Sequence, residues 1–219
     1  MGLQAKALRS IAILTLSTGC VAGGLMTGCQ KDDPDRAGVS GKIVSSGTAD
    51  IGGDFTLIDV NGATVTQDIL LEKPHLIYFG FAYCPDVCPT ALSKLGAAQT
   101  LMGDRSDDVG FVLITIDPKR DTPEALSEYV TFDPFPRGLI GLTGSEAQVD
   151  VVKAAYKVAA TPVMDDGSPV PEGSLDYTVD HSDIVYLMGT DGKFVDFFSA
   201  RSTPHDISIR VRDLLAKGK

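Results

Sequence analysis

Two cysteines, Cys84 and Cys88, stand four positions apart where an apolar run gives way to a segment with helical character. The apolar run at residues 76–81 predicts a buried strand, and the pattern of residues 90–101 predicts a helix. The start of a helix presents unpaired N–H groups and the positive end of a dipole, and both favour a thiolate over a thiol. Thiolates exchange disulfides and bind soft metal ions such as Cu(I). The pattern therefore predicts redox chemistry or metal binding at this turn.

A metal ion held by two thiolates usually needs at least one further ligand, and imidazole is well suited. The chain contains three histidines. His75 opens the strand that leads to the cysteines, so it lies on the order of 25 Å away at about 3.3 Å per residue. His205 falls in the first turn of the last predicted helix, where a surface position is expected. His181 immediately precedes a predicted strand and is the remaining candidate ligand.

A structural disulfide between Cys84 and Cys88 is the simplest alternative, because cysteine pairs in an oxidising compartment are commonly bridged. Such a bridge would close a loop with only three intervening residues. A loop this short constrains the unfolded chain very little, so the bridge would stabilise the fold weakly. This argues that the pair serves chemistry rather than stability.

The N-terminal residues have the layout of a secretory signal: basic positions, an uncharged stretch over residues 10–26, and a polar segment after Cys29. The residues that end at Cys29 resemble a bacterial lipobox, in which this cysteine is acylated and Cys20 is removed with the signal. An uncleaved anchor helix is the alternative, because a bilayer requires about 20 apolar residues. Both arrangements predict a bacterial envelope protein tethered to the inner membrane on its periplasmic side.

Composition divides the chain into three parts. Residues 1–28 predict a signal peptide or membrane anchor, residues 29–52 predict a polar tether, and residues 53–217 predict one folded domain. The formal net charge of −10 disfavours a nucleic-acid partner and suits a soluble acidic surface.

Within the domain, predicted strands alternate with predicted helices. The elements are a hairpin around Asn61-Gly62, strands at 76–81 and 109–116, a helix from Thr122, a strand at 139–142, a helix at 145–158, an inserted hairpin or loop at 163–179, a hairpin around Asp191-Gly192, and a helix from Thr203. This order predicts an α/β fold with a mixed sheet flanked by helices.

Three motifs together resemble the SCO/SenC family: residues 78–90 around the cysteines, residues 115–124 after the second buried strand, and residues 180–182 around His181. The resemblance extends from about residue 53 to 215. SCO/SenC proteins are membrane-tethered, thioredoxin-like copper proteins that help to build the dinuclear copper centre of cytochrome c oxidase. The resemblance implies a thioredoxin-like fold in which the segment bearing His181 lies against the cysteine turn.

The resemblance also implies that Cys84, Cys88 and His181 bind one copper ion as Cu(I) or Cu(II). The implied partners are the copper-centre subunit of cytochrome c oxidase and a periplasmic copper donor. The residue chemistry agrees, because two thiolates suit Cu(I) and a nitrogen ligand makes the site competent for Cu(II). A thiol–disulfide oxidoreductase that reduces the cysteines of a copper acceptor is the alternative, and it would not need His181. Peroxide reduction is less well supported, because a peroxidatic cysteine acts alone in its turn.

Charged residues near these motifs have simpler default interpretations. Asp86 is expected to be a carboxylate at a helix start, and Arg120 and Asp121 are expected to serve as turn and cap residues. Asp117 follows a central strand at the same edge as the cysteines, so we expect it to lie near them.

Overall fold

The structure is a computed structural model that describes residues 49–218. These residues fall within one compact unit, Ser45–Lys219. The expected signal or anchor over residues 1–28, and nearly all of the expected tether, lie outside the described residues. Between residues 49 and 218 no helix is long and apolar enough to cross a membrane.

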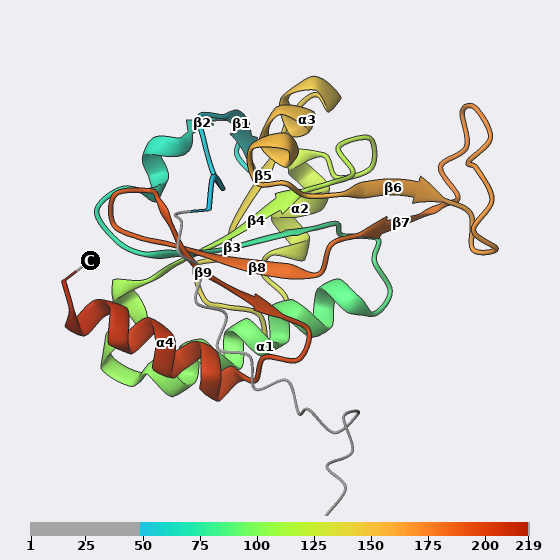
Figure 1. Cartoon of the computed structure of the whole chain (residues 1–219). Helices are drawn as coiled ribbons and strands as arrows, with labels where there is room; N and C mark the ends of the chain where they lie inside the picture. The colour runs from blue at the N-terminus through green and yellow to red at the C-terminus, as the bar shows by residue number, and fades with distance from the viewer. Residues whose placement is uncertain (1–48, 219) are drawn as a thin grey trace, which may run out of the picture. The chain divides into compact units, whose positions relative to one another are not determined.

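A seven-stranded mixed sheet forms the centre of the domain, in the order β2-β1-β5-β4-β3-β8-β9 (Figure 1). Its middle consists of three parallel strands, β3 (His75–Gly80), β4 (Gly110–Thr115) and β5 (Ile140–Thr143). Strands β3 and β4 are buried along their whole length. Continuous burial is expected for parallel strands that are covered on both faces, and it explains why their sequences are almost wholly apolar.

Antiparallel hairpins flank the parallel strands. One hairpin joins β1 (Thr56–Asp59) to β2 (Thr64–Thr66), and the other joins β8 (Ile184–Met188) to β9 (Phe194–Ser199). Strand β8 pairs antiparallel with β3, which places the second hairpin beside the strand that leads to the cysteines. Both hairpins were predicted from their Asn-Gly and Asp-Gly turns, and the glycine of each turn has a positive φ.

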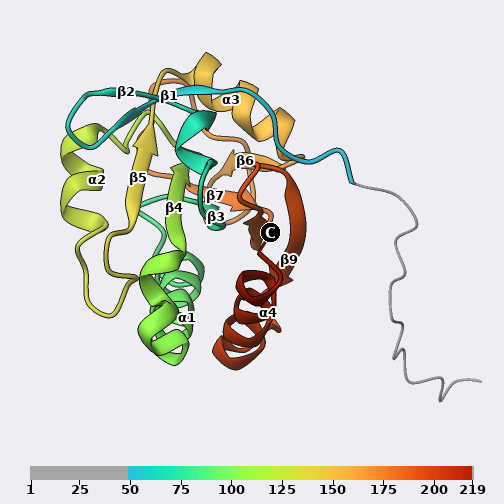
Figure 2. The same cartoon turned by 90° about the vertical axis from the view of Figure 1, so that its left-hand side faces the viewer.

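Four helices accompany the sheet: α1 (Val87–Met102), α2 (Pro123–Tyr129), α3 (Glu146–Ala155) and α4 (Pro204–Ala216). Helices α1 and α4 lie side by side against one face of the sheet (Figures 1 and 2). The opposite face is covered by α3, whose end packs against Phe79 of β3. Two short 3-10 helices, Gln67–Leu70 and Gly103–Asp108, were not predicted.

Helix caps follow the sequence signals except at the cysteines. Thr122, Ser145 and Thr203 precede α2, α3 and α4, and each side chain accepts a hydrogen bond from a backbone N–H of the first turn. Asp86 occupies the cap position of α1, but its side chain makes no capping hydrogen bond. The first N–H groups of α1 therefore remain available to the cysteine sulfurs.

The insertion forms a two-stranded antiparallel sheet, β6 (Ala160–Val163) with β7 (Thr178–His181). The chain between them, residues 164–177, projects away from the main sheet (Figure 1). The expected inserted hairpin or loop is a hairpin, and its paired strands extend to residues 160 and 181. His181 is thus the last residue of a strand, and this strand fixes its position relative to Ala160.

Candidate metal centre

The cysteine turn connects β3 to α1. The N–H of Cys84 donates to the carbonyl of Phe81 at 3.3 Å, and the N–H of Cys88 donates to Sγ of Cys84 at 3.3 Å. The helix begins at Val87, three residues earlier than the sequence predicted, so Cys88 lies in its first turn. Both cysteines are free thiols, Cys84 half-buried and Cys88 buried. The start of α1 thus directs a backbone donor at one sulfur, as a thiolate requires.

His181 reaches the same place from β7. Its Nε2 lies 3.6 Å from Sγ of Cys88, and its Nδ1 donates to the carbonyl of Ser182 at 3.0 Å. Because a carbonyl can only accept, the proton of the neutral ring is on Nδ1 and the Nε2 lone pair faces the sulfur. The ring is held edge-on by Tyr78 and Phe81, with centroid distances of 6.3 Å and 6.0 Å.

These three side chains supply a soft donor set of two sulfurs and one imidazole nitrogen. Two donors that share one metal ion at about 2.0–2.3 Å each lie no more than about 4.3 Å apart, and the separation between Cys88 and His181 is within this limit. Among residues 49–218, no three His, Cys, Asp or Glu side chains are already gathered as a metal cage. The donors would therefore have to close around an ion. Such a set suits copper or zinc rather than magnesium or calcium.

The two thiols share a single proton. The hydrogen bond from Cys88 lowers the pKa of Cys84 to about 4, against the effect of burial and with support from His181 and the Cys88 N–H. The pKa of Cys88 is raised, first by that same hydrogen bond and then by burial. Burial lowers the pKa of His181, but the contact with Cys84 and the Ser182 carbonyl outweigh burial and raise it overall. An entering metal ion would displace the remaining thiol proton.

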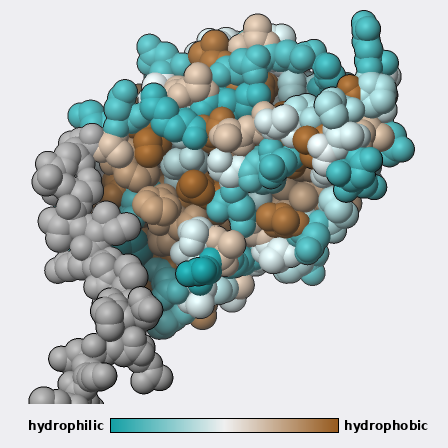
Figure 3. All heavy atoms as spheres, turned by 45° about the vertical axis from the view of Figure 1, so that its right-hand side comes forward, coloured by the Kyte–Doolittle hydropathy of each residue, from teal (hydrophilic) through white to brown (hydrophobic). Residues whose placement is uncertain are grey.

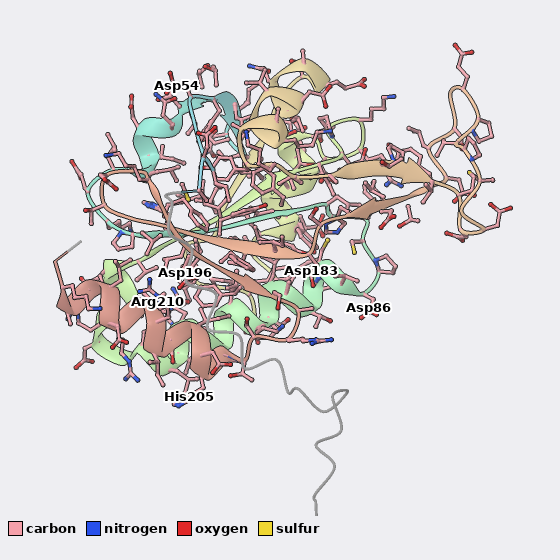
Figure 4. The ribbon with its side chains drawn as sticks, viewed as in Figure 1. Asp54, Asp86, Asp183, Asp196, His205 and Arg210 are labelled. Carbon is pink, nitrogen blue, oxygen red and sulfur yellow. The ribbon has the colours of Figure 1, made fainter. Side chains whose placement is uncertain are left out.

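Three carboxylates surround the opening of the site. A cavity of about 390 Å³ is lined by Cys84, His181 and the side chains of Asp86, Asp180 and Asp183. Asp86 comes from the start of α1 and Asp183 from the segment between β7 and β8, and both lie at the same end of the sheet (Figure 4). A negative opening of this kind attracts a cation.

A buried arginine joins the cysteine turn to the strand that carries His181. The Arg120 Nε donates to Asp117, and its Nη1 donates to the carbonyls of Tyr177 at 2.7 Å and Leu175 at 3.2 Å. The hydroxyl of Tyr177 donates to the same Asp117 carboxylate at 2.6 Å. The guanidinium carbon lies 3.8 Å from the ring centre of Tyr177 and 5.2 Å from that of Tyr83. Arg120 therefore contacts three chain segments that meet at the site.

A buried aspartate fixes the start of the cysteine turn. Both carboxylate oxygens of Asp121 accept the N–H of Ala82 at 3.2 Å, and one accepts the hydroxyl of Thr115 at 2.6 Å. Burial raises its pKa to about 6, although these hydrogen bonds oppose the shift. Arg120 and Asp121 were expected to be turn and cap residues, but Thr122 is the cap of α2, and the side chains of Arg120 and Asp121 instead connect the segments that form the site. Asp117, as expected, lies at this edge of the sheet.

The other two histidines lie away from the site, as predicted. His75 is buried at the start of β3, where its Nδ1 donates to the carbonyl of Lys73 at 2.8 Å. His205 is exposed in the first turn of α4 (Figure 4). Of the three histidines, only His181 can contact the cysteines.

Known proteins share this fold and sequence. The family model described as SCO1/SenC matches residues 44–216. Protein SenC of Rhodobacter capsulatus is 40% identical over 176 residues, which cover 80% of this chain and 76% of SenC. The structure of Bradyrhizobium japonicum ScoI with copper bound matches with a TM-score of 0.65 and 39% identity, over 75% of this chain and 99% of ScoI. Arabidopsis thaliana ScoI with copper bound matches with a TM-score of 0.67 and 38% identity, over 76% and 99%. These matches confirm the predicted thioredoxin-like fold.

Proposed function

Because this chain belongs to the SCO1/SenC family, we propose that it binds one copper ion and delivers it to the copper-centre subunit of cytochrome c oxidase. The observation that carries this proposal is the distance of 3.6 Å between Nε2 of His181 and Sγ of Cys88. Further support comes from two related proteins of nearly 40% identity whose structures contain copper.

In this proposal copper is a cargo, held by Cys84, Cys88 and His181. Cys84 is already a thiolate, and the proton of Cys88 leaves when the ion binds. The Ser182 carbonyl keeps the proton of His181 on Nδ1, so Nε2 is free to bind. Two thiolates suit Cu(I), and the imidazole extends the site to Cu(II).

Release of the cargo is favoured by an exposed site with few ligands. Cys84 is half-buried, and its neighbours Tyr83 and Val87 are 61% and 45% exposed. An acceptor could therefore approach the ion from the side of this turn and replace the ligands one at a time. The same opening would admit copper from a periplasmic donor. We further propose that the N-terminal region tethers the domain to the periplasmic side of the inner membrane, either through a lipid on Cys29 after residues 1–28 are removed or through an uncleaved anchor helix within residues 1–28.

Copper titration of wild-type protein and two histidine variants tests the proposal. Wild type is expected to bind one equivalent of Cu(II) with a sulfur-to-copper charge-transfer band. His181→Ala is expected to lose this band, whereas the matched control His205→Ala should keep it, because His205 is exposed in α4. Wild-type Cu(II) affinity and spectrum in His181→Ala would contradict the proposed site.

A thiol–disulfide oxidoreductase is the second candidate, and the low pKa of Cys84 favours it. In this reaction the Cys84 thiolate attacks an acceptor disulfide, Cys88 resolves the mixed disulfide, and the acceptor leaves as a dithiol. The Cys84–Cys88 pair is oxidised and needs a thiol reductant for the next cycle. His181→Ala cells that retain full oxidase assembly would favour this candidate, since it needs only the thiols.

A further inference from the structure

Tyr78 lies on β3 beneath the proposed copper site and contributes a buried hydroxyl that the proposed mechanism does not use. Its side chain is fully buried, and its hydroxyl makes no hydrogen bond with any residue in the described part of the chain. A buried hydroxyl without a partner is costly, and native structures contain few of them. Its position next to the proposed metal site suggests that this hydroxyl gains an acceptor when the ligands there bind a metal ion.

A glycine allows Tyr78 and Cys88 to approach each other. Residues 78 and 80 project from the same face of β3, because alternate residues of a strand share a face. A Cβ atom on Gly80 would lie 2.7 Å from Cε1 of Tyr78 and 3.0 Å from Sγ of Cys88. The tyrosine ring and the sulfur therefore border the same small space, which any larger residue at position 80 would fill. The edge-on contact with His181 places Tyr78 beside a second proposed ligand.

Burial keeps the Tyr78 hydroxyl protonated and able to donate a hydrogen bond. An ordinary phenol has a pKa of about 10, and full burial favours its neutral form. The phenol therefore keeps its proton, which it can offer to an anion. A sulfur that binds a metal ion has lost its proton and can only accept, so a metal-bound thiolate at Cys88 would supply the acceptor that this buried hydroxyl lacks.

We propose that the Tyr78 hydroxyl donates a hydrogen bond to Sγ of Cys88 when that sulfur binds copper as a thiolate. The inference rests on the proposed copper site and adds a residue that tunes it. A hydrogen bond to a metal-bound thiolate withdraws electron density from the sulfur. Sulfur that donates less electron density stabilises Cu(II) less, so Tyr78 favours Cu(I) and raises the reduction potential of the bound ion. Tyr78 acts through Cys88 and does not itself bind copper.

The test compares Tyr78→Phe with Tyr156→Phe. Tyr156 also has a buried hydroxyl without a partner among residues 49–218, but it packs against Phe79 and Tyr186, away from the cysteines. Tyr78→Phe is expected to move the sulfur-to-Cu(II) charge-transfer band to lower energy. It should also lower the ratio of Cu(I) affinity to Cu(II) affinity by about tenfold, as for the loss of one hydrogen bond to a charged group. Tyr156→Phe is expected to leave both unchanged.

Three results would overturn the inference. A wild-type band and affinity ratio in Tyr78→Phe would show that Cys88 is not the acceptor of this hydroxyl. Equal shifts in both variants would show a general loosening of the core instead of a specific hydrogen bond. Wild-type protein that binds no copper would overturn the proposed function as well, whereas in the first two cases the copper site itself would stand.

Discussion

At the scale of single residues, the site depends on how protons are distributed among three side chains. Cys84 carries the negative charge, Cys88 keeps the one proton of the pair, and the Nδ1–H of His181 is directed to a backbone carbonyl. This arrangement leaves one sulfur without a proton in the metal-free protein. The proton of Cys88, and that on Nε2 wherever the His181 ring is charged, would leave when a metal ion binds at the proposed site.

Alkylation of metal-free protein by iodoacetamide measures the thiolate of Cys84. Because the pKa of Cys84 is lowered to about 4, its thiolate is complete at neutral pH and is lost only as the pH falls toward 4. The rate, corrected for the reagent, is therefore expected to be nearly constant from pH 8 to pH 6. Cys88→Ala removes the thiol that donates to Cys84, so the pKa should rise and the rate should fall at pH 6. A wild-type rate that drops about tenfold per pH unit over this range, as for an ordinary thiol, would contradict the shared proton.

At the scale of elements, the ends of β3, β4 and β7 meet at the site and are joined by side chains from the loop after β4. Asp121 fixes the start of the cysteine turn through Ala82. Arg120 fixes β7 through the carbonyls of Tyr177 and Leu175. The proposed copper ligands thus come from two segments whose relative position is set by a third.

Arg120→Lys tests this connection. Lysine keeps the charge beside Asp117 but lacks the planar fork that reaches several acceptors at once. The strand that carries His181 should then be held less firmly, and Cu(II) affinity is expected to fall by about 10- to 100-fold. Arg105→Lys, in an exposed ion pair with Asp108, is the matched control. Wild-type Cu(II) affinity in Arg120→Lys, measured by competition with a chelator, would show that Arg120 does not position His181.

Local signals predicted most elements but not the contacts that assemble the site. The Asn-Gly and Asp-Gly turns marked both hairpins of the sheet, and threonine or serine caps marked three helices. A hairpin or loop was predicted for the insertion, but the extent of β6 and β7 was not, because their sequence is interrupted by Pro and Gly and they pair residues 15 to 21 positions apart. Arg120 was assigned to a turn because its partner Tyr177 stands 57 residues away. No local sequence pattern predicts a contact over this distance. The charged residues Asp117, Arg120 and Asp121, which directly follow the buried strand β4, are the sequence feature that could have indicated a role at this edge of the sheet.

At the scale of the whole domain, His181 and His75 lie at opposite ends of the sheet. His181 lies at the end of the sheet where β3 and β4 finish, which is where α/β folds usually bind ligands. His75 lies at the opposite end of β3, pressed against Gly110 of β4. On the face shown in Figure 3, hydrophobic side chains form small separate patches among hydrophilic ones.

His75 should make the domain sensitive to acid. Burial lowers its pKa from 6.5 to about 4, so below pH 6.5 the unfolded chain binds a proton that the folded chain does not. The free energy of unfolding is therefore expected to fall as the pH drops from 6.5 to 4, by about 3 kcal/mol from this residue. In urea unfolding, His75→Asn should lose the part of this slope that comes from His75, whereas the lowered pKa of Cys84 keeps a further slope of the same sign. The exposed control His205→Asn should retain the wild-type slope. Equal slopes in wild type and His75→Asn would assign the acid sensitivity to other groups.

We propose that Cys84 and Cys88, from the turn before α1, and His181, from β7, bind one ion. X-ray absorption of the protein loaded with one equivalent of copper measures the ligands directly. Two sulfur ligands and at least one imidazole nitrogen are expected for the Cu(II) form, and the imidazole scattering should disappear in His181→Ala. Copper with two sulfur ligands and no imidazole in the wild-type protein, or unchanged imidazole scattering in His181→Ala, would contradict the account.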